Sequence, residues 1–316
     1  GFPDKGMPAW SETLKATQIW NLALYVAEQR QGTTILDKRA DIPLAIPAGR
    51  IASERHAFRI EVVAEGLDPL PFSIAPLADG RILLAERMRG LSIVERDGTR
   101  SPLIRGTPPV YADSTVFLGQ VQGLGWLLDV APHPDFARNG WIYLHHTDRC
   151  TDCNALSRKS KRPVSMNRLI RGRIRDGAWV DQEILWQADP ETYTDTSDLT
   201  AGGRIAFDGR GHVFFSVGMK APLEFLGIQD LSLPYGKIYR LHDDGRVPAD
   251  NPFVKTPGAL PSIWTYGHRS PQGLEWNTRT REAWSTEMGP RGGDELNRLL
   301  PGRNYGWPLF TSGVNY

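Results

Sequence analysis

The sequence lacks any long hydrophobic run, and its charges almost cancel. No stretch of about eighteen consecutive apolar residues occurs along the chain, so no membrane-spanning helix is predicted. Lys and Arg total 37 and Asp and Glu total 36, which gives a formal net charge of +1. That balance offers no electrostatic basis for binding nucleic acid or an anionic membrane. We therefore expect neither partner.

Cysteine is also scarce, with Cys150 and Cys153 alone in the sequence Cys-Thr-Asp-Cys. Asn154 follows where a haem-attachment motif needs His, and no βαβ pattern suggests a thioredoxin-like redox pair. We prefer a short-loop disulfide formed in an oxidising compartment. Free thiols are the next alternative, and a metal site is the last.

Several local motifs are missing as well. The sequence contains neither the Gly-x-Ser-x-Gly elbow of serine hydrolases nor the Gly-x-Gly-x-x-Gly loop of nicotinamide-binding domains. It has no signal peptide and starts with Gly1-Phe-Pro-Asp, which we interpret as a mature or trimmed end.

Turn residues and aromatics are plentiful instead, with 32 Gly, 24 Pro and 10 Trp, a composition that favours an all-β repeat architecture. One pattern recurs at roughly 60 to 70 residues, a polar turn followed by a short apolar strand. It occurs at Leu77–Arg87, Pro134–His145, Phe207–Ser216 and Asn277–Ser285. Units that cannot bury both faces alone must stack on neighbours, so a radial array of sheets is the natural closure.

The first residues differ from the rest. Residues 11–30 have apolar side chains at the spacing of one helical face, which predicts a short N-terminal helix. Residues 31–54 are rich in Pro, Gly, Ala and charge and are predicted to form a linker. The basic run from Arg158 to Arg175 is interpreted as a solvated loop and hairpin rather than a binding patch.

The motifs that carry chemistry lie near the end of the chain. They are Gly267-His-Arg-Ser-Pro-Gln-Gly-Leu-Glu-Trp276, Glu287-Met-Gly-Pro-Arg-Gly-Gly-Asp-Glu-Leu-Asn297 and Gly302-Arg-Asn-Tyr-Gly-Trp-Pro308. Arg269 and Gln272 offer planar hydrogen-bonding groups. Asp294 and Glu295 are hard oxygen ligands of the kind that calcium prefers.

Together with Leu127–Phe136, Gly202–Asp208, Gly236–Leu241 and Asp244–Phe253, these motifs resemble the soluble PQQ-dependent aldose sugar dehydrogenases and the glucose/sorbosone dehydrogenase family. The resemblance runs from about residue 64 to residue 316 and implies an all-β, six-bladed β-propeller. Four repeat units suggest that the chain covers four to five blades and is C-terminally truncated. The resemblance also implies that His133 belongs to a structural turn.

The resemblance implies two cofactors, PQQ and calcium. The main-chain carbonyls of Gly289 and Pro290 would bind calcium, and Glu295 matches a carboxylate that binds a separate structural calcium. Arg269, a predicted catalytic residue, would bind the quinone and stabilise its growing negative charge. Ser270 and Gln272 would contact the cofactor, although Ser270 stands where the family usually has Asn.

The sugar side of the site departs from the family. Thr200 stands where the family has its general-base His, and Met219 replaces the Asp of a Gly-Asp pair. A threonine hydroxyl does not titrate in the useful range. Asp195 and Asp198 are the candidate replacement bases, with Asp198 the preferred one, although both could simply be solvated loop acids.

The N-terminal segment resembles the end of a c-type cytochrome domain, because Gly6-Met-Pro-Ala-Trp10 precedes the predicted helix. Met7 would be the axial ligand of a haem c present only in a longer parent chain. The predicted domains are thus a cytochrome remnant at 1–30, a linker at 31–54 and a propeller domain at 55–316.

We therefore predict a periplasmic or secreted enzyme that oxidises a sugar or aldehyde substrate and passes electrons to a c-type cytochrome. Two alternatives remain. One is a catalytically degenerate propeller that binds a ligand or partner. The other is a lactonase-type hydrolase, which would need several carboxylates around one ion.

Overall fold

The computed structural model describes residues 46–67, 71–113, 115–117, 120–220 and 225–314. The chain divides into two compact units, Gly1–Val62 and Val63–Tyr316. The predicted N-terminal helix, Met7 and most of the predicted linker lie outside the described residues, so these predictions and the domain boundaries stay predictions.

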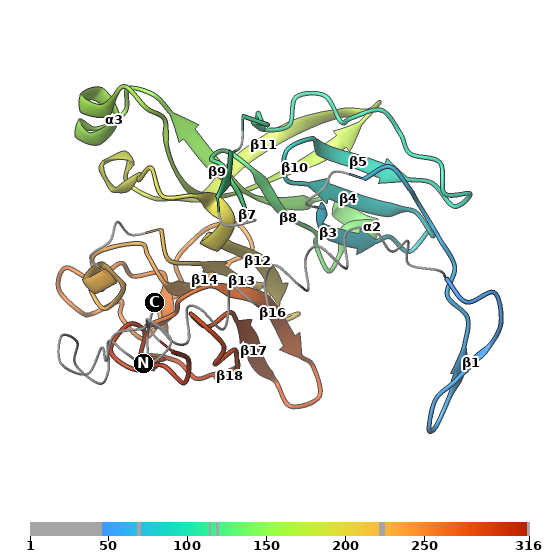
Figure 1. The fold of residues 1–316 in the computed structure, drawn as a ribbon. Coiled ribbons are helices and arrows are strands. Elements are labelled where there is room, and N and C mark those ends of the chain that lie inside the picture. Colours follow the sequence, from blue (N-terminus) through green and yellow to red (C-terminus); the bar gives the residue numbers. More distant parts are fainter. Residues whose placement is uncertain (1–45, 68–70, 114, 118–119, 221–224, 315–316) are drawn as a thin grey trace, which may run out of the picture. The chain divides into compact units, whose positions relative to one another are not determined.

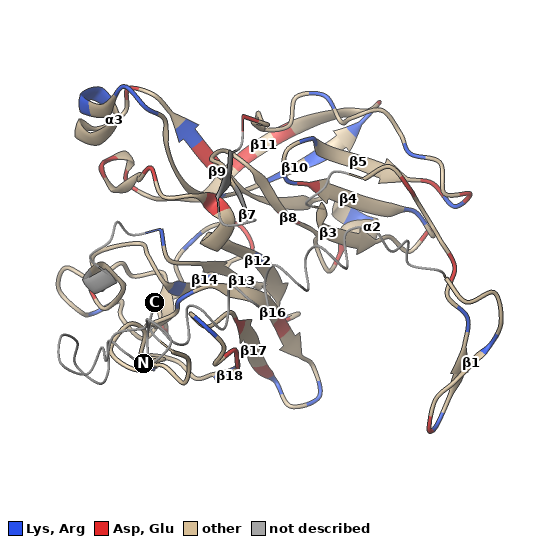
Figure 2. Cartoon of the chain, viewed as in Figure 1, with Lys and Arg blue, Asp and Glu red and all other residues tan. Residues whose placement is uncertain are grey.

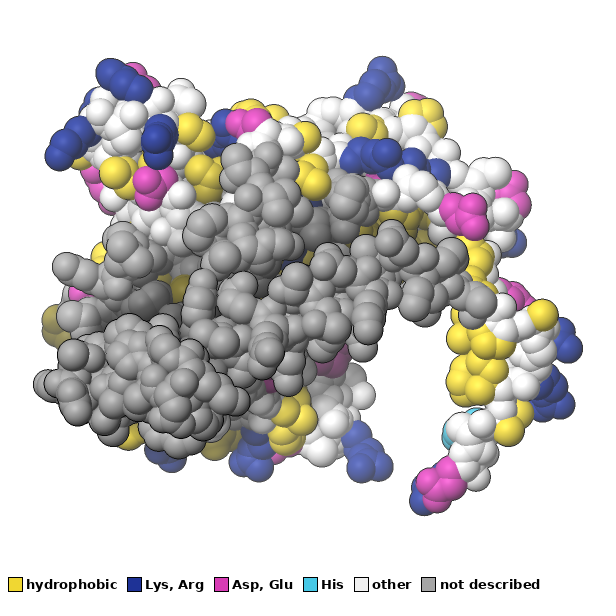
Figure 3. Space-filling model, viewed as in Figure 1, with side chains coloured by type: hydrophobic (Ala, Val, Ile, Leu, Met, Phe, Trp, Pro, Cys, Tyr) yellow, Lys and Arg dark blue, Asp and Glu magenta, His cyan; other side chains and the backbone are white. Residues whose placement is uncertain are grey.

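The described part of the first unit contains a small antiparallel pair, β1 (Ile51–Ala52) and β2 (Ala57–Phe58). Phe58, Ile60 and Val62 are 47%, 46% and 53% exposed. Figure 3 shows hydrophobic side chains gathered along this segment. Phe58 of β2 and the two apolar residues after the pair are therefore exposed.

The second unit consists mainly of four antiparallel sheets formed in chain order (Figure 1). The first sheet contains β3 (Pro71–Pro76), β4 (Ile82–Glu86) and β5 (Gly90–Val94). The second contains β8 (Leu127–Pro132), β9 (Ile142–Cys150), β10 (Val164–Arg175) and β11 (Ala178–Gln187). The third contains β12 (Gly202–Phe207), β13 (His212–Val217), β14 (Lys237–His242) and β15 (Ile263–Tyr266). The fourth contains β16 (Pro271–Asn277), β17 (Glu282–Glu287) and β18 (Glu295–Leu299).

Short elements fill the connections. Strands β6 (Thr115–Phe117) and β7 (Gln120–Gln122) pair with each other between the first two sheets. The helices are α2 (Phe136–Asn139) and α3 (Ala155–Ser160), with 3₁₀ turns at Pro190–Thr192, Asp198–Thr200 and Phe225–Ile228. The described chain is therefore mostly β-structure, as predicted from its composition.

The four repeats predicted from the sequence correspond to the four sheets. In each repeat the polar turn joins the first strand of a sheet to the second, at β3–β4, β8–β9, β12–β13 and β16–β17. The first strands of successive sheets also contact one another, β3 with β8, β8 with β12 and β12 with β16. Successive sheets that meet through their first strands are arranged as the blades of a propeller.

Each pair of neighbouring sheets buries its own hydrophobic cluster. Leu83 of the first sheet packs with Leu144 and Ile170 of the second. The second and third sheets share a larger cluster that includes Tyr143, Leu169, Phe215 and Tyr239. The third and fourth share Phe214, Ile238, Leu274 and Ala283. Burying one large apolar side chain stabilises the fold by about 1.5–3 kcal/mol, so these separate contacts hold neighbouring sheets together.

The paired glycines before Arg204 have a packing role at the start of β12. Gly203 has a φ of +97°, and a Cβ placed there would lie 2.3 Å from Cδ1 of Leu128. Because β12 approaches β8 so closely, a side chain at this position would clash. The motif thereby lets the first strands of two sheets meet.

The basic run is partly neutralised by cross-strand partners. Arg168 pairs with Asp148 at 2.6 Å, and Arg171 pairs with Glu183 at 2.7 Å. Figure 2 shows both signs of charge along these strands, with basic residues on α3. The run therefore forms the end of α3 and strand β10, most of whose residues are buried between β9 and β11. The prediction of a solvated loop is wrong, and only the hairpin, which β10 forms with β11, is confirmed.

His133 has the structural role predicted for it. Its Nδ1 accepts hydrogen bonds from the amide of Asp135 and the side chain of Asn139, both at 2.9 Å. Nε2 therefore carries the proton and donates to Asp243 at 3.1 Å. This histidine links the turn after β8 to the loop after β14.

Candidate functional site

The predicted site residues lie on loops and strand ends at one end of the third and fourth sheets. Gly202 pairs with Val217, and Val217 pairs with Lys237, so the loop before β12 and the loop after β13 share that end. Pro271 pairs with Glu287, which places the loop before β16 beside the loop after β17. Because β12 contacts β16, the two sets of loops are neighbours.

Arg269 is held between two of these loops. Its side chain is buried, and the residue is only 3% exposed. Nη1 donates to the main-chain oxygen of Met288 at 2.9 Å, and the guanidinium carbon lies 5.4 Å from the centre of a Trp307 ring. The backbone amide of Arg269 donates to the carboxylate of Glu287. This guanidinium thus lies beside the Gly289-Pro290 turn.

The Gly289-Pro290 turn is compact. Its Gly289 amide donates to Asp294 Oδ1 at 2.9 Å, and a Cβ on Gly289 would lie 2.2 Å from the Gly292 carbonyl oxygen. A larger residue could not occupy this place. Asp294 therefore stabilises the turn itself.

A small cavity brings together residues predicted to serve different roles. Its volume is about 10 Å³, and its lining includes Arg269, Gly289, Pro290 and Glu295. A cavity of about 10–15 Å³ is the smallest that holds one water molecule. Arg269 and the residues predicted to bind metal thus line one cavity, whereas their roles stay predictions.

The chemistry of this donor set fits a calcium ion. Two main-chain carbonyls and a carboxylate are hard oxygen ligands, and calcium takes six to eight of them, so further ligands would be needed. Glu295 also accepts a hydrogen bond from Asn297 at 3.0 Å. The cavity is too small for a tricyclic quinone, which would have to lie outside it.

Gln272 and Ser270 connect this region to the sugar-side loops. Gln272 Nε2 donates to Ser270 Oγ at 2.7 Å and to the main-chain oxygen of Leu199 at 3.3 Å. The main-chain oxygen of Arg269 accepts from the Met219 amide at 2.7 Å. Residues far apart in sequence are therefore brought together as predicted.

The two altered sugar-side positions contact each other directly. Thr200 Oγ1 donates to the main-chain oxygen of Met219 at 2.7 Å. The hydroxyl proton of Thr200 is thus already bonded.

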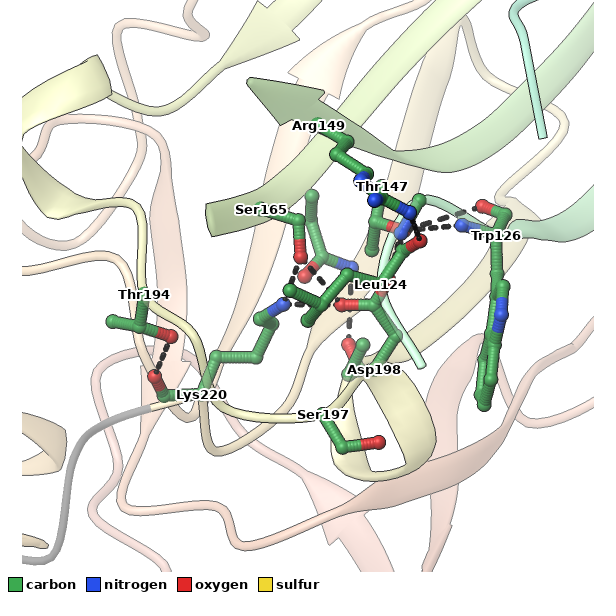
Figure 4. Close-up of polar contacts among 12 residues, drawn as sticks. Leu124, Trp126, Thr147, Arg149, Ser165, Thr194, Ser197, Asp198 and Lys220 are labelled. Carbon is green, nitrogen blue, oxygen red and sulfur yellow. Dashed lines mark hydrogen bonds and ion pairs between the residues drawn. The ribbon is translucent and has the colours of Figure 1, made fainter. Parts of the chain in front are cut away.

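Asp198 is the centre of a buried polar network (Figure 4). It is 1% exposed, and its Oδ1 accepts from Lys220 Nζ and, at 2.8 Å, from Ser165 Oγ. Oδ2 accepts from Thr147 Oγ1 and, at 2.6 Å, from the Gly125 amide. A carboxylate with four donors and no solvent contact is poorly placed to take a proton from a substrate.

The geometry therefore favours a structural role for Asp198 over the catalytic role predicted from the sequence. Asp195 differs because it is exposed. It lines a recess of about 310 Å³ together with Gln122, Arg162 and Ser197. Of the two predicted bases, Asp195 is the accessible one.

Two buried lysines lie near these loops. Burial lowers the pKa of Lys220, and the charge of Asp198 partly opposes this effect. Burial also lowers the pKa of Lys237 to about 7. Lys237 Nζ donates to the main-chain oxygens of Ile228 and Tyr235 at 2.8 and 2.6 Å.

Three residues of the site received no role from the sequence. His268 and Glu287 lie inside the quoted motifs and Lys220 directly follows Met219, but nothing in their spacing indicates a buried partner. In the structure His268 Nδ1 contacts Glu287 Oε2 at 2.9 Å.

The two cysteines form the predicted disulfide, Cys150–Cys153, at the end of β9. Within the described ranges, no group of three or more His, Cys, Asp or Glu residues is arranged to hold a metal. The calcium prediction rests instead on the main-chain oxygens of Gly289 and Pro290. No helix in the described part of the chain is long and apolar enough to cross a membrane.

Comparison with known proteins gives consistent results. The family model for glucose/sorbosone dehydrogenase matches residues 69–316. An aldose sugar dehydrogenase of Escherichia coli is 34% identical over 280 residues, which cover 87% of this chain and 68% of that protein. A quinoprotein glucose dehydrogenase B of Acinetobacter calcoaceticus is 26% identical over 300 residues, covering 85% and 56%.

Two solved structures show the same similarity. The apo form of the E. coli soluble aldose sugar dehydrogenase has a TM-score of 0.68 at 34% identity, covering 81% of this chain and 67% of that one. The PQQ-bound aldose sugar dehydrogenase of Streptomyces coelicolor has a TM-score of 0.60 at 27% identity, covering 84% and 68%. The chain spans about 56–68% of the length of these four relatives. It belongs to the glucose/sorbosone dehydrogenase family of oxidoreductases.

Proposed function

We propose that this chain is the larger part of a PQQ- and calcium-dependent dehydrogenase that oxidises an aldose or a related hydroxy or aldehyde substrate. The observation that supports this most directly is the contact between the Arg269 loop and the Gly289-Pro290 turn around one ion-sized cavity. Family membership and the PQQ-bound Streptomyces relative point to the same chemistry.

In this proposal Gly289, Pro290 and Glu295 hold calcium, with Glu295 joining the carbonyls because it lines the same cavity. Bound PQQ and calcium would supply a polarised quinone that accepts hydride. Arg269 provides positive charge beside that site. Gln272 and Ser270 position the Arg269 loop against Leu199, next to Thr200.

The substrate proton needs an acceptor other than Thr200. Its hydroxyl is bonded to the Met219 carbonyl, and Asp198 is buried in its own network. We propose Asp195 as the acceptor, because it is an exposed carboxylate on the same loop, five residues before Thr200. Loss of the usual base lowers rates by about 10²- to 10⁴-fold, so turnover is expected to be slow.

The proposal extends to the parts of the protein beyond the described residues. We propose a six-bladed propeller for the complete domain, of which the four sheets form part. Electrons would pass to haem c on a longer parent chain, with Met7 as the axial ligand. The disulfide supports a periplasmic or secreted location, because such bonds persist in oxidising compartments.

A second candidate function is a degenerate propeller that binds a ligand or partner without turnover. The hydrogen bond between Thr200 and Met219 favours it, because both family side chains at these positions are gone.

Cofactor loading and turnover separate these functions. The purified chain is incubated with PQQ and calcium, binding is followed by thermal shift, and dye reduction is measured with a panel of sugars and aldehydes. Reduction that is lost in Asp195→Asn and kept in the control Asp152→Asn, an exposed loop acid, supports the enzyme. Tight binding without reduction supports the degenerate protein. No binding rejects the enzyme and leaves a propeller that binds a different ligand or partner.

A further inference from the structure

We propose that Glu287 is a positioning residue that clamps the Arg269 loop to the Gly289-Pro290 turn. The importance of this clamp for a cofactor rests on the function proposed above. The clamp itself does not depend on any bound cofactor, because one buried carboxylate couples the two loops.

The Glu287 carboxylate holds two neighbouring groups of the loop before β16. One oxygen accepts from the Arg269 amide, and the other contacts His268 Nδ1 at 2.9 Å. Glu287 is 6% exposed and His268 is fully buried. Hydrogen bonds to a buried charge are stronger than those between neutral groups, and each missing partner is costly.

The Arg269 loop returns two bonds to the strand that carries Glu287. Arg269 Nη1 donates to the Met288 carbonyl at 2.9 Å, and Ser270 O accepts from the Met288 amide at 3.0 Å. Met288 is the residue directly before Gly289. The clamp is therefore reciprocal, since each loop supplies a side chain that bonds to the backbone of the other.

His268 is held at both ring nitrogens and at its ring face. Its Nε2 contacts Thr265 Oγ1 at 2.8 Å, and its ring stacks on Tyr305 with centres 4.7 Å apart. The order Thr265, His268, Glu287 has the appearance of a hydrolytic triad. Thr265 and His268 are both fully buried, so no substrate can reach the hydroxyl.

The clamp also reaches the predicted metal ligand. Asn297 Nδ2 lies 3.0 Å from Glu295 Oε2 and 3.5 Å from Glu287 Oε2, so one amide group stands between the two carboxylates. Glu287 and Glu295 are directly opposite each other on β17 and β18. A change in the position of Glu287 would therefore shift Arg269, the Gly289-Pro290 turn and Glu295.

Hydrogen exchange in the cofactor-free chain tests the clamp. Glu287→Asp keeps the charge but shortens the reach, whereas Glu287→Gln keeps the reach and one acceptor oxygen. With Gln, His268 can change tautomer, accept from the new amide through Nδ1 and donate to Thr265 through Nε2. Glu275→Asp, an exposed change on β16 of the same sheet, is the control.

We expect exchange at the Arg269 and Met288 amides to accelerate about tenfold or more in Glu287→Asp, the factor for losing one bond to a charged group. Glu287→Gln should change it by less than about threefold, because the bonds are largely restored. Equal rates in Glu287→Asp and the control would overturn the proposal. Equal acceleration in all four sheets would also overturn it, since that indicates only a general loss of stability.

A second measurement separates the clamp from the proposed function. Calcium and PQQ binding to the unmodified chain and to both variants is followed by thermal shift. If the unmodified chain binds, Glu287→Asp should weaken binding and Glu287→Gln should largely retain it. If it does not bind, the proposed function fails, whereas the exchange result still decides the clamp.

Discussion

Replacing Lys220 by Met tests the buried network around Asp198. Methionine keeps most of the length of the lysine stem but removes the ammonium group that bonds to Asp198 and, at 2.6 Å, to Ser165. Removing one partner of a buried ion pair costs about 3–5 kcal/mol, because the other charge stays buried. Three other donors still reach Asp198, so we expect the lower end of that range, about 3 kcal/mol.

The assay is urea unfolding, monitored by far-UV circular dichroism. The dependence of the unfolding free energy on urea concentration should be the same in all variants. Lys159→Met, an exposed change on α3, should alter the free energy of unfolding by less than about 0.5 kcal/mol. The double variant with Asp198→Asn should be more stable than the sum of the two single losses predicts, because the uncompensated charge is gone. A Lys220→Met protein within about 0.5 kcal/mol of the parent would refute the structural role assigned to this pair.

Three further predictions address pH, catalysis and packing. Because burial lowers the pKa of Lys237 to about 7 from 10.5, its contribution to stability is complete above pH 10.5, is lost progressively as the pH falls from 10.5 to 7, and is gone below 7. The unfolding free energy of the parent relative to Lys237→Met should therefore rise between pH 7 and 10 by at most about 1.4 kcal/mol per pH unit, and parallel pH profiles in urea titrations would contradict this. If the missing base is the only defect, Thr200→His should raise the rate of dye-linked sugar oxidation by about 10²-fold or more. An unchanged rate at full cofactor loading would show that the site lacks more than a base. Gly203→Ala should cost about 2 kcal/mol or more in a thermal or urea melt, because its Cβ meets Leu128 and its φ is positive, whereas Gly177→Ala, which has open space, should cost only the backbone strain.

Much of the fold could be predicted from the sequence because its signals are local. Each polar turn followed by an apolar run, as at Phe207–Ser216, becomes the turn and second strand of a sheet. The closing motifs likewise brought Arg269 and Gly289 together, because both lie at strand ends of one sheet. The number of sheets follows from counting such units.

The role of Asp198 could not be predicted, because it depends on partners distant in sequence. Thr147 and Gly125 come from 51 and 73 residues away and bury the carboxylate. Nothing in the local sequence Thr196-Ser-Asp-Leu-Thr200 shows whether Asp198 is the centre of a buried hydrogen-bond network or a solvated acid. Burial of this kind is visible only once the sheets are packed.

The bond from Thr200 to residue 219 ends on a main-chain oxygen rather than on the methionine side chain. Any amino acid at 219 that keeps the local backbone would present the same acceptor. The side chain at 219 can therefore be exchanged without changing the bond that Thr200 makes, and engineering can alter the two positions one at a time.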